Sequence, residues 1–122
     1  MKKKKILLAE DDPDISYLLK IKLSNVGYEV TAIPNAKPLL EATGERPDLY
    51  ILDRQMPDID GVEVCRYLKG NVSTKDIPVI MMSACPDLGL FAKQAGAEDY
   101  LQKPFKMNDL LTLVSKHIQQ SA

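Results

Sequence analysis

The chain has 122 residues, of which 45% are hydrophobic, and a formal net charge of −1. This length and apolar content predict one folded domain, residues 1–122, with its own core. A net charge near zero argues against direct binding of nucleic acid. No apolar stretch is long enough for a membrane span or a secretory signal. Cys65 and Cys85 are too few and too far apart for a zinc site or a disulfide framework, so we expect a reducing, cytoplasmic setting.

Strand-like and helix-like patterns alternate along the chain. Short, β-favouring apolar runs predict strands at Lys4–Ala9, Tyr28–Ile33, Leu49–Asp53, Pro78–Ser83 and Asp99–Gln102. Between and after them, helices are predicted from Pro13 to Gly27, from Asn35 to about Ala42, around Val62–Leu68, over Asp87–Gln94 and over Met107–Ile118. Five strands that alternate with five helices are typical of an α/β fold, a doubly wound parallel sheet with helices on both faces.

Capping residues and glycines predict where several helices begin and end. Asp12 followed by Pro13 is typical of an N-cap with proline at the first helical position. Asn35 is predicted to cap the short second helix. Gly27 and Gly96 are predicted to end the first and fourth helices.

Three of the predicted strands end in residues that apolar runs usually avoid. The first strand runs into Glu10 and Asp11, the third ends at Asp53, and the fifth is followed by Lys103. Because the carboxyl ends of neighbouring parallel strands open on one crevice, we expect these side chains to share it. Clustered carboxylates repel one another unless they are protonated or bridged by a cation, and Mg²⁺ prefers such oxygen ligands. The residues alone therefore predict a metal-dependent phosphoryl site.

Four motifs, in order along the chain, resemble those of response-regulator receiver domains, the CheY-like family of two-component signalling. They are the acidic segment Leu8–Asp12, the segment Asp53–Gly61 with its Asp-x-x-Met-Pro-x-x-Asp-Gly pattern, Met82–Ala84 and Asp99–Phe105. The resemblance implies the flavodoxin-like strand order 2-1-3-4-5. It also implies a phosphorylation switch as the function.

The resemblance assigns the nucleophile and the metal ligands. Asp53 would accept a phosphoryl group from a sensor histidine kinase or a His-containing phosphotransfer protein. Asp11 would bind Mg²⁺ directly and Glu10 through water. Asp53 and the backbone carbonyl of Gln55 would complete the metal site. Acids that only complement the start of a helix are the plainer interpretation of Glu10 and Asp11.

The resemblance also assigns residues that would sense the phosphoryl group. Lys103 would pair with Asp53 and then with a phosphoryl oxygen, behind a cis bond to Pro104. Ser83 would donate its hydroxyl to another oxygen, beside the small Ala84. Tyr100 would swing inward when that hydroxyl moves, although plain packing also explains a tyrosine on this strand.

The family's partner surface consists of the fourth helix, the fifth strand and the fifth helix. It implies a phosphorylation-dependent homodimer or an effector protein as partner. The segment Cys85–Gln94 is shorter than is typical of the family, which alters this surface. Both a stand-alone relay and a receiver from a larger regulator fit the sequence.

Two other functions compete with a signalling switch that only phosphorylates and slowly dephosphorylates itself. The first is a small Mg²⁺-dependent phosphatase that passes through an aspartyl phosphate. Phosphatases of the haloacid-dehalogenase kind need a second acid two residues after the nucleophile, where this chain has Gln55. The second is a nucleotide binder, but no glycine-rich phosphate loop follows any predicted strand. The switch is therefore favoured, and we do not expect an enzyme.

Overall fold

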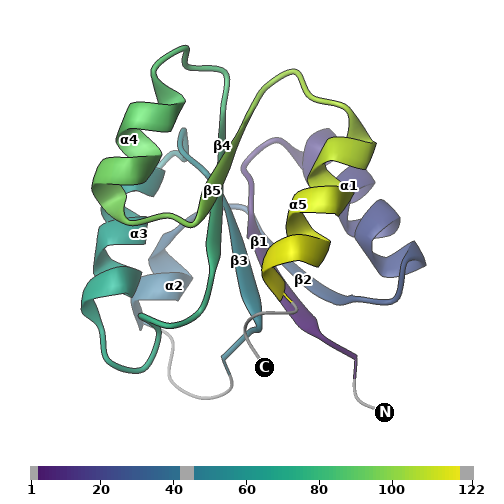
Figure 1. Ribbon diagram of the computed structural model, residues 1–122, viewed down its shortest axis with the longest axis horizontal. Coiled ribbons are helices and arrows are strands. Elements are labelled where there is room, and N and C mark those ends of the chain that lie inside the picture. The colour runs from purple at the N-terminus through teal and green to yellow at the C-terminus, as the bar shows by residue number, and fades with distance from the viewer. Residues whose placement is uncertain (1–2, 42–45, 119–122) are drawn as a thin grey trace.

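A computed structural model describes residues 3–41 and 46–118 of the chain. Within them, strands and helices alternate as the sequence predicts (Figure 1). The strands are β1 (Lys5–Ala9), β2 (Glu29–Ile33), β3 (Leu49–Asp53), β4 (Val79–Ser83) and β5 (Asp99–Gln102). The helices are α1 (Pro13–Asn25), α2 (Lys37–Glu41), α3 (Gly61–Gly70), α4 (Leu88–Ala95) and α5 (Met107–Ile118). Ala42, the predicted end of the second helix, lies outside the described residues.

The five strands form one parallel sheet in the order β2-β1-β3-β4-β5, which confirms the predicted fold. Figure 1 shows α1 and α5 on one face of the sheet and α2, α3 and α4 on the other. The central strands β3 and β4 are buried at every residue because helices cover both of their faces. Their alternate side chains therefore fill two separate cores.

One core lies under α2, α3 and α4, and the other lies under α1 and α5. In the first, Leu52 and Met81 of the sheet pack with Leu68 of α3. In the second, Ile51 of β3 and Met82 of β4 belong to the same buried cluster as residues of both covering helices. These two cores hold the central strands rigidly, and with them the residues at the strand ends.

The predicted N-cap of α1 is confirmed, and so are two predicted helix ends. The Asp12 side chain accepts hydrogen bonds from the amides of Asp14 and Ile15, at 2.9 and 3.2 Å. Gly27 and Gly96 take up φ angles of +105° and +88°, in the left-handed region that favours glycine.

The predicted cap of α2 is wrong. Because α2 begins at Lys37, the residue before its first position is Ala36 rather than Asn35. The amides of Ala36 and Lys37 instead donate to the carboxylate of Asp58, at 3.0 and 2.8 Å. Asp58 belongs to the loop after β3, so the start of α2 is tied to the segment that follows Asp53.

Among the described residues, no helix is both long and apolar enough to cross a membrane.

Candidate functional site

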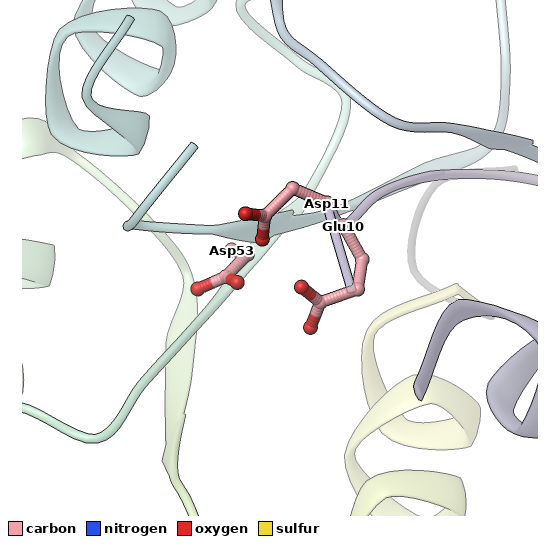
Figure 2. Close-up of side chains that lie close together, drawn as sticks. All are labelled: Glu10, Asp11 and Asp53. Atoms are coloured by element: carbon pink, nitrogen blue, oxygen red, sulfur yellow. The ribbon is translucent and has the colours of Figure 1, made fainter. Parts of the chain in front are cut away.

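Three carboxyl groups meet at the carboxyl end of the sheet. Ala9 of β1 pairs in register with Leu52 of β3, so the residues that follow them lie side by side. These residues are Glu10 and Asp53, and Asp11 comes next in the chain. One oxygen atom from each of the three groups lies within 4.8 Å of the other two. Figure 2 shows the three carboxyl groups gathered at this end of the sheet. The predicted convergence of the acidic residues is therefore present in the structure.

Two of these acids are buried, and burial changes their chemistry. Glu10 and Asp53 are 1% and 2% exposed, whereas Asp11 is exposed. The pKa of Glu10 is raised from 4.5 to about 7, mainly by burial and then by the neighbouring Asp53, although Lys103 acts in the opposite direction. A bound cation would stabilise the ionised forms of these clustered acids, because it offsets both their burial and their mutual repulsion.

Lys103 supplies one positive charge to the cluster. Its backbone amide donates to the carbonyl oxygen of Ser83 at 2.8 Å, which fixes the residue beside the end of β4. Its ammonium group donates to Glu10 Oε1 at 2.7 Å and to Asp53 Oδ2 at 3.1 Å. Burial alone would lower the pKa of Lys103, but the two carboxylates outweigh that effect and raise it. The bond to Pro104 is cis, as the resemblance implied.

Ser83 lies at the end of the strand next to β3. It is the last residue of β4 and fully buried, one position beyond Met82, which pairs in register with Asp53. Its hydroxyl oxygen accepts a hydrogen bond from the amide of Cys85 at 3.0 Å. Because a hydroxyl that accepts still has its own proton, the Ser83 side chain can also act as a donor. Ala84, which follows it, is exposed.

Asp53 is held through both of its carboxylate oxygens. Lys103 binds Oδ2, and the backbone amide of Gln55 donates to Oδ1 at 3.2 Å. The side chain of Gln55 is exposed. The amide contact brings the backbone of Gln55 next to Asp53, where its carbonyl was predicted to bind the metal.

The donor set fits a hard divalent cation. Three carboxylates within mutual reach carry more charge than the single ammonium group of Lys103 neutralises. Oxygen-only ligands of this kind, two of them buried, suit Mg²⁺ better than a softer metal. Glu10, Asp11 and Asp53 are the residues that would hold such a cation.

Tyr100 lies apart from this cluster. It is in the middle of β5, 47% exposed, and its ring lies over Gly89 of α4. The sequence placed it correctly on the strand that leads to Lys103. Its contact with α4 was not predicted.

Sequence reasoning also missed Arg54, the residue after Asp53. Its guanidinium group stacks over the ring of Phe91 in α4, 4.0 Å from the ring centroid, and lies 3.6 Å from Asp60. Its backbone amide donates to the carbonyl of Met82 at 2.8 Å. An arginine next to the predicted nucleophile, followed by an aromatic residue on a later helix, was the only available signal.

Comparison with known proteins agrees with this geometry. The family model of the response regulator receiver domain matches residues 6–115. The DNA-binding dual master transcriptional regulator RpaA of Synechocystis is 39% identical over 113 residues, which are 90% of this chain and 47% of RpaA. The chain spans about half the length of the curated relatives it matches.

Solved structures show the same fold. A putative response regulator from Chloroflexus aurantiacus has a TM-score of 0.90 and 30% identity, over 97% of this chain and 99% of that one. The response regulator protein TrrA from Thermotoga maritima, in complex with Mg²⁺ and BeF, has a TM-score of 0.81 and 33% identity, over 93% and 97%. The site and both comparisons lead to one conclusion: the chain belongs to the response regulator receiver domain family.

Proposed function

We propose that this receiver domain accepts a phosphoryl group on Asp53 and changes its surface in response. The observation that carries the proposal is the arrangement of Asp53 at the end of β3. It is buried, bound by Lys103 and by the amide of Gln55, and next to two further acids. A carboxylate in this position is a fixed nucleophile in a site built to balance additional negative charge.

The proposed transfer follows from these positions. A carboxylate oxygen of Asp53 attacks the phosphorus atom of a phosphohistidine on a histidine kinase or phosphotransfer protein. The phosphorus–oxygen bond forms as the phosphorus–nitrogen bond breaks. The electron pair stays on the imidazole nitrogen, which takes up a proton from water. The product is an aspartyl phosphate.

The chain's own residues would hold the new group. Lys103 already binds Asp53 Oδ2, so its ammonium group needs only a small movement to reach a phosphoryl oxygen. The hydroxyl of Ser83 would donate to a second oxygen. Asp11, Glu10, Asp53 and the carbonyl of Gln55 would hold Mg²⁺, which when bound neutralises charge on the transferring phosphoryl group.

The response would pass through Ser83 and Tyr100 to the surface of α4, β5 and α5. A new contact at Ser83 exists only in the phosphorylated form, so it shifts the equilibrium between two conformations. We propose that this surface then binds a second copy of the domain or an effector protein. Response regulator receivers act with histidine kinases, and we place the domain in the cytoplasm, where its free thiols fit a reducing compartment.

We also propose what the domain does not do: it is not a phosphatase with rapid turnover, and it does not bind nucleic acid directly. Turnover is confined to phosphorylation of Asp53 and slow hydrolysis, because Gln55 has no acidic group to protonate a leaving group. Residues 1–122 act as one receiver domain without direct contact to nucleic acid. The DNA binding in the name of RpaA is a property of that longer protein.

Incubation with acetyl phosphate and Mg²⁺ tests the phosphoacceptor. Intact-mass measurement should show the addition of one phosphoryl group to the wild-type chain and none to Asp53→Asn. Asp60→Asn is the matched control, because Asp60 caps α3 by accepting from the amide of Val62 at 2.8 Å and asparagine can do the same. Undiminished labelling of Asp53→Asn would overturn the assignment.

A further inference from the structure

A glycine in the first turn of α4 lies directly under the ring of Tyr100. A Cβ atom at residue 89 would be 2.9 Å from both Cζ and the hydroxyl oxygen of Tyr100, and 3.3 Å from Cε1. Real Cβ atoms do not approach other heavy atoms to 2.9 Å. The ring therefore occupies space that every residue except glycine would fill.

Helix formation does not explain this glycine. Glycine is a poor helix former, and α4 has only eight residues. Asp87, at the N-cap position, makes no capping hydrogen bond with its side chain. A better helix former at residue 89 would strengthen a weakly started helix. The contact with Tyr100 is the feature of the structure that requires glycine there.

We propose that Gly89 forms a notch in α4 that holds the ring of Tyr100 in its outward position, and that the notch sets how readily the domain switches. This inference rests on the proposed function, since it assigns a tuning role within that switch. The notch contact is made only while the ring points outward. Any side chain at residue 89 would weaken the outward position without touching Asp53, Lys103 or Ser83.

The geometry also predicts which group yields when the notch is filled. The atoms that a Cβ would meet are the far end of a side chain that is 47% exposed, not backbone. The ring can rotate about its side-chain torsions, whereas a shift of α4 would disturb Leu88 and Ala92, both of which are buried. Filling the notch should therefore displace Tyr100 and leave α4 in place.

Gly89→Ala tests the notch, and Gly70→Ala is its matched control. Gly70 is the last residue of α3, and a Cβ atom there would meet nothing within 4 Å. Spectra of chains with ¹³C-labelled tyrosine rings should be recorded with Mg²⁺ alone and with Mg²⁺ and beryllofluoride. Without beryllofluoride, Gly89→Ala should move the Tyr100 ring signals toward the positions they take in the wild type with beryllofluoride. Gly70→Ala should leave them unmoved.

The outcomes separate the notch from the switch. If the Tyr100 ring signals are the same in Gly89→Ala and in the wild type without beryllofluoride, the proposed role of Gly89 is wrong. This holds whether or not beryllofluoride shifts the signals. If beryllofluoride does not shift the Tyr100 ring signals of the wild type, the proposed conformational switch is wrong, even if Gly89→Ala displaces the ring. Labelling of Asp53 by acetyl phosphate in both glycine variants shows that each is folded and competent.

A stability cycle provides a second test. In a Tyr100→Ala background the notch is empty, so Gly89→Ala should raise the urea midpoint by as much as Gly70→Ala does. With Tyr100 present, the gain should be smaller or become a loss, because the ring must leave its site. The same gain from Gly89→Ala in both backgrounds would contradict the proposal.

Discussion

Lys103 and Glu10 are 93 positions apart in the sequence, yet the ammonium nitrogen of Lys103 lies 2.7 Å from Glu10 Oε1. This is shorter than the 3.1 Å between the same nitrogen and Asp53 Oδ2. Glu10 also accepts from the amide of Asp12 through Oε2, at 3.2 Å. The lysine thus connects the two buried acids, and Glu10 is part of the charge balance around the nucleophile as well as a metal ligand candidate.

Loss of Lys103 should destabilise the metal-free domain. Lys103→Met keeps much of the side chain's length but leaves Glu10 and Asp53 without their cation. We expect the free energy of unfolding to fall by about 3 kcal/mol at pH 8, because removing one partner of a buried ion pair leaves the other charge without a partner. Urea denaturation with EDTA measures it. Lys37→Met, which breaks an exposed pair with Glu41, should cost less than about 0.5 kcal/mol. Equal losses would mean that Lys103 is an ordinary surface lysine.

The raised pKa of Glu10 gives the metal-free domain a defined pH dependence. Between the usual value of 4.5 and about 7, the folded chain holds a proton on Glu10 that the unfolded chain has released. The contribution of this group to stability is therefore complete below pH 4.5 and is lost as the pH rises through about 7, by about 3 kcal/mol in all. Glu10→Gln should lack this part of the profile, so the difference between the two unfolding curves measures it. Parallel profiles would contradict the raised pKa.

Asp11 and its neighbour Asp12 should respond differently to substitution. Asp11→Ala removes a proposed direct ligand and should weaken Mg²⁺ binding at least about tenfold, or 1.4 kcal/mol. Asp12→Ala removes the cap of α1, so it should lower stability by about 1 kcal/mol and change Mg²⁺ affinity much less. Calorimetric titration with Mg²⁺ distinguishes the two. If Asp11→Ala and the wild type bind Mg²⁺ with the same affinity, Asp11 is not a metal ligand and only complements the start of α1.

The stack of Arg54 on Phe91 should contribute a measurable coupling. A double-mutant cycle with Arg54→Gln and Phe91→Leu should give about 0.5–1 kcal/mol, the range for a partly exposed cation–π contact. Arg66 of α3, whose ion-pair partner is Glu63, provides the control, and its cycle with Phe91→Leu should give a value near zero. A coupling at Arg54 no larger than the control would show that the stack does not join α4 to the residue after Asp53.

Much of the fold was predictable because the sequence carries two local signals. The apolar runs of β3 and β4 are uninterrupted, since helices cover both faces of those strands, and an acid or hydroxyl at their ends breaks the pattern. The acids and Lys103 could be brought together from strand order alone. Strand order does not reveal that Lys103 lies as close to Glu10 as to Asp53, because that depends on side-chain placement.

The remaining features depend on loops and on contacts across elements. Asp58 accepts hydrogen bonds from the amides at the start of α2, although it lies more than 20 positions further along the chain. No residue near Asn35 in the sequence indicates this contact. The approach of Tyr100 to Gly89 depends on how α4 packs against β5. A glycine inside a predicted helix is visible in the sequence, but the ring that requires it is not.

The most direct test of the account is the backbone amide spectrum of the Mg²⁺-loaded domain with and without beryllofluoride, which should mimic the phosphoryl group on Asp53. If the domain is a switch, signals should move at Asp53 and also at Ser83, Ala84 and residues 99–104, and the changes should be absent from Asp53→Asn. Changes confined to the immediate neighbours of Asp53, with Ser83 and Tyr100 unmoved, would contradict the account. They would make the domain a passive phosphate carrier.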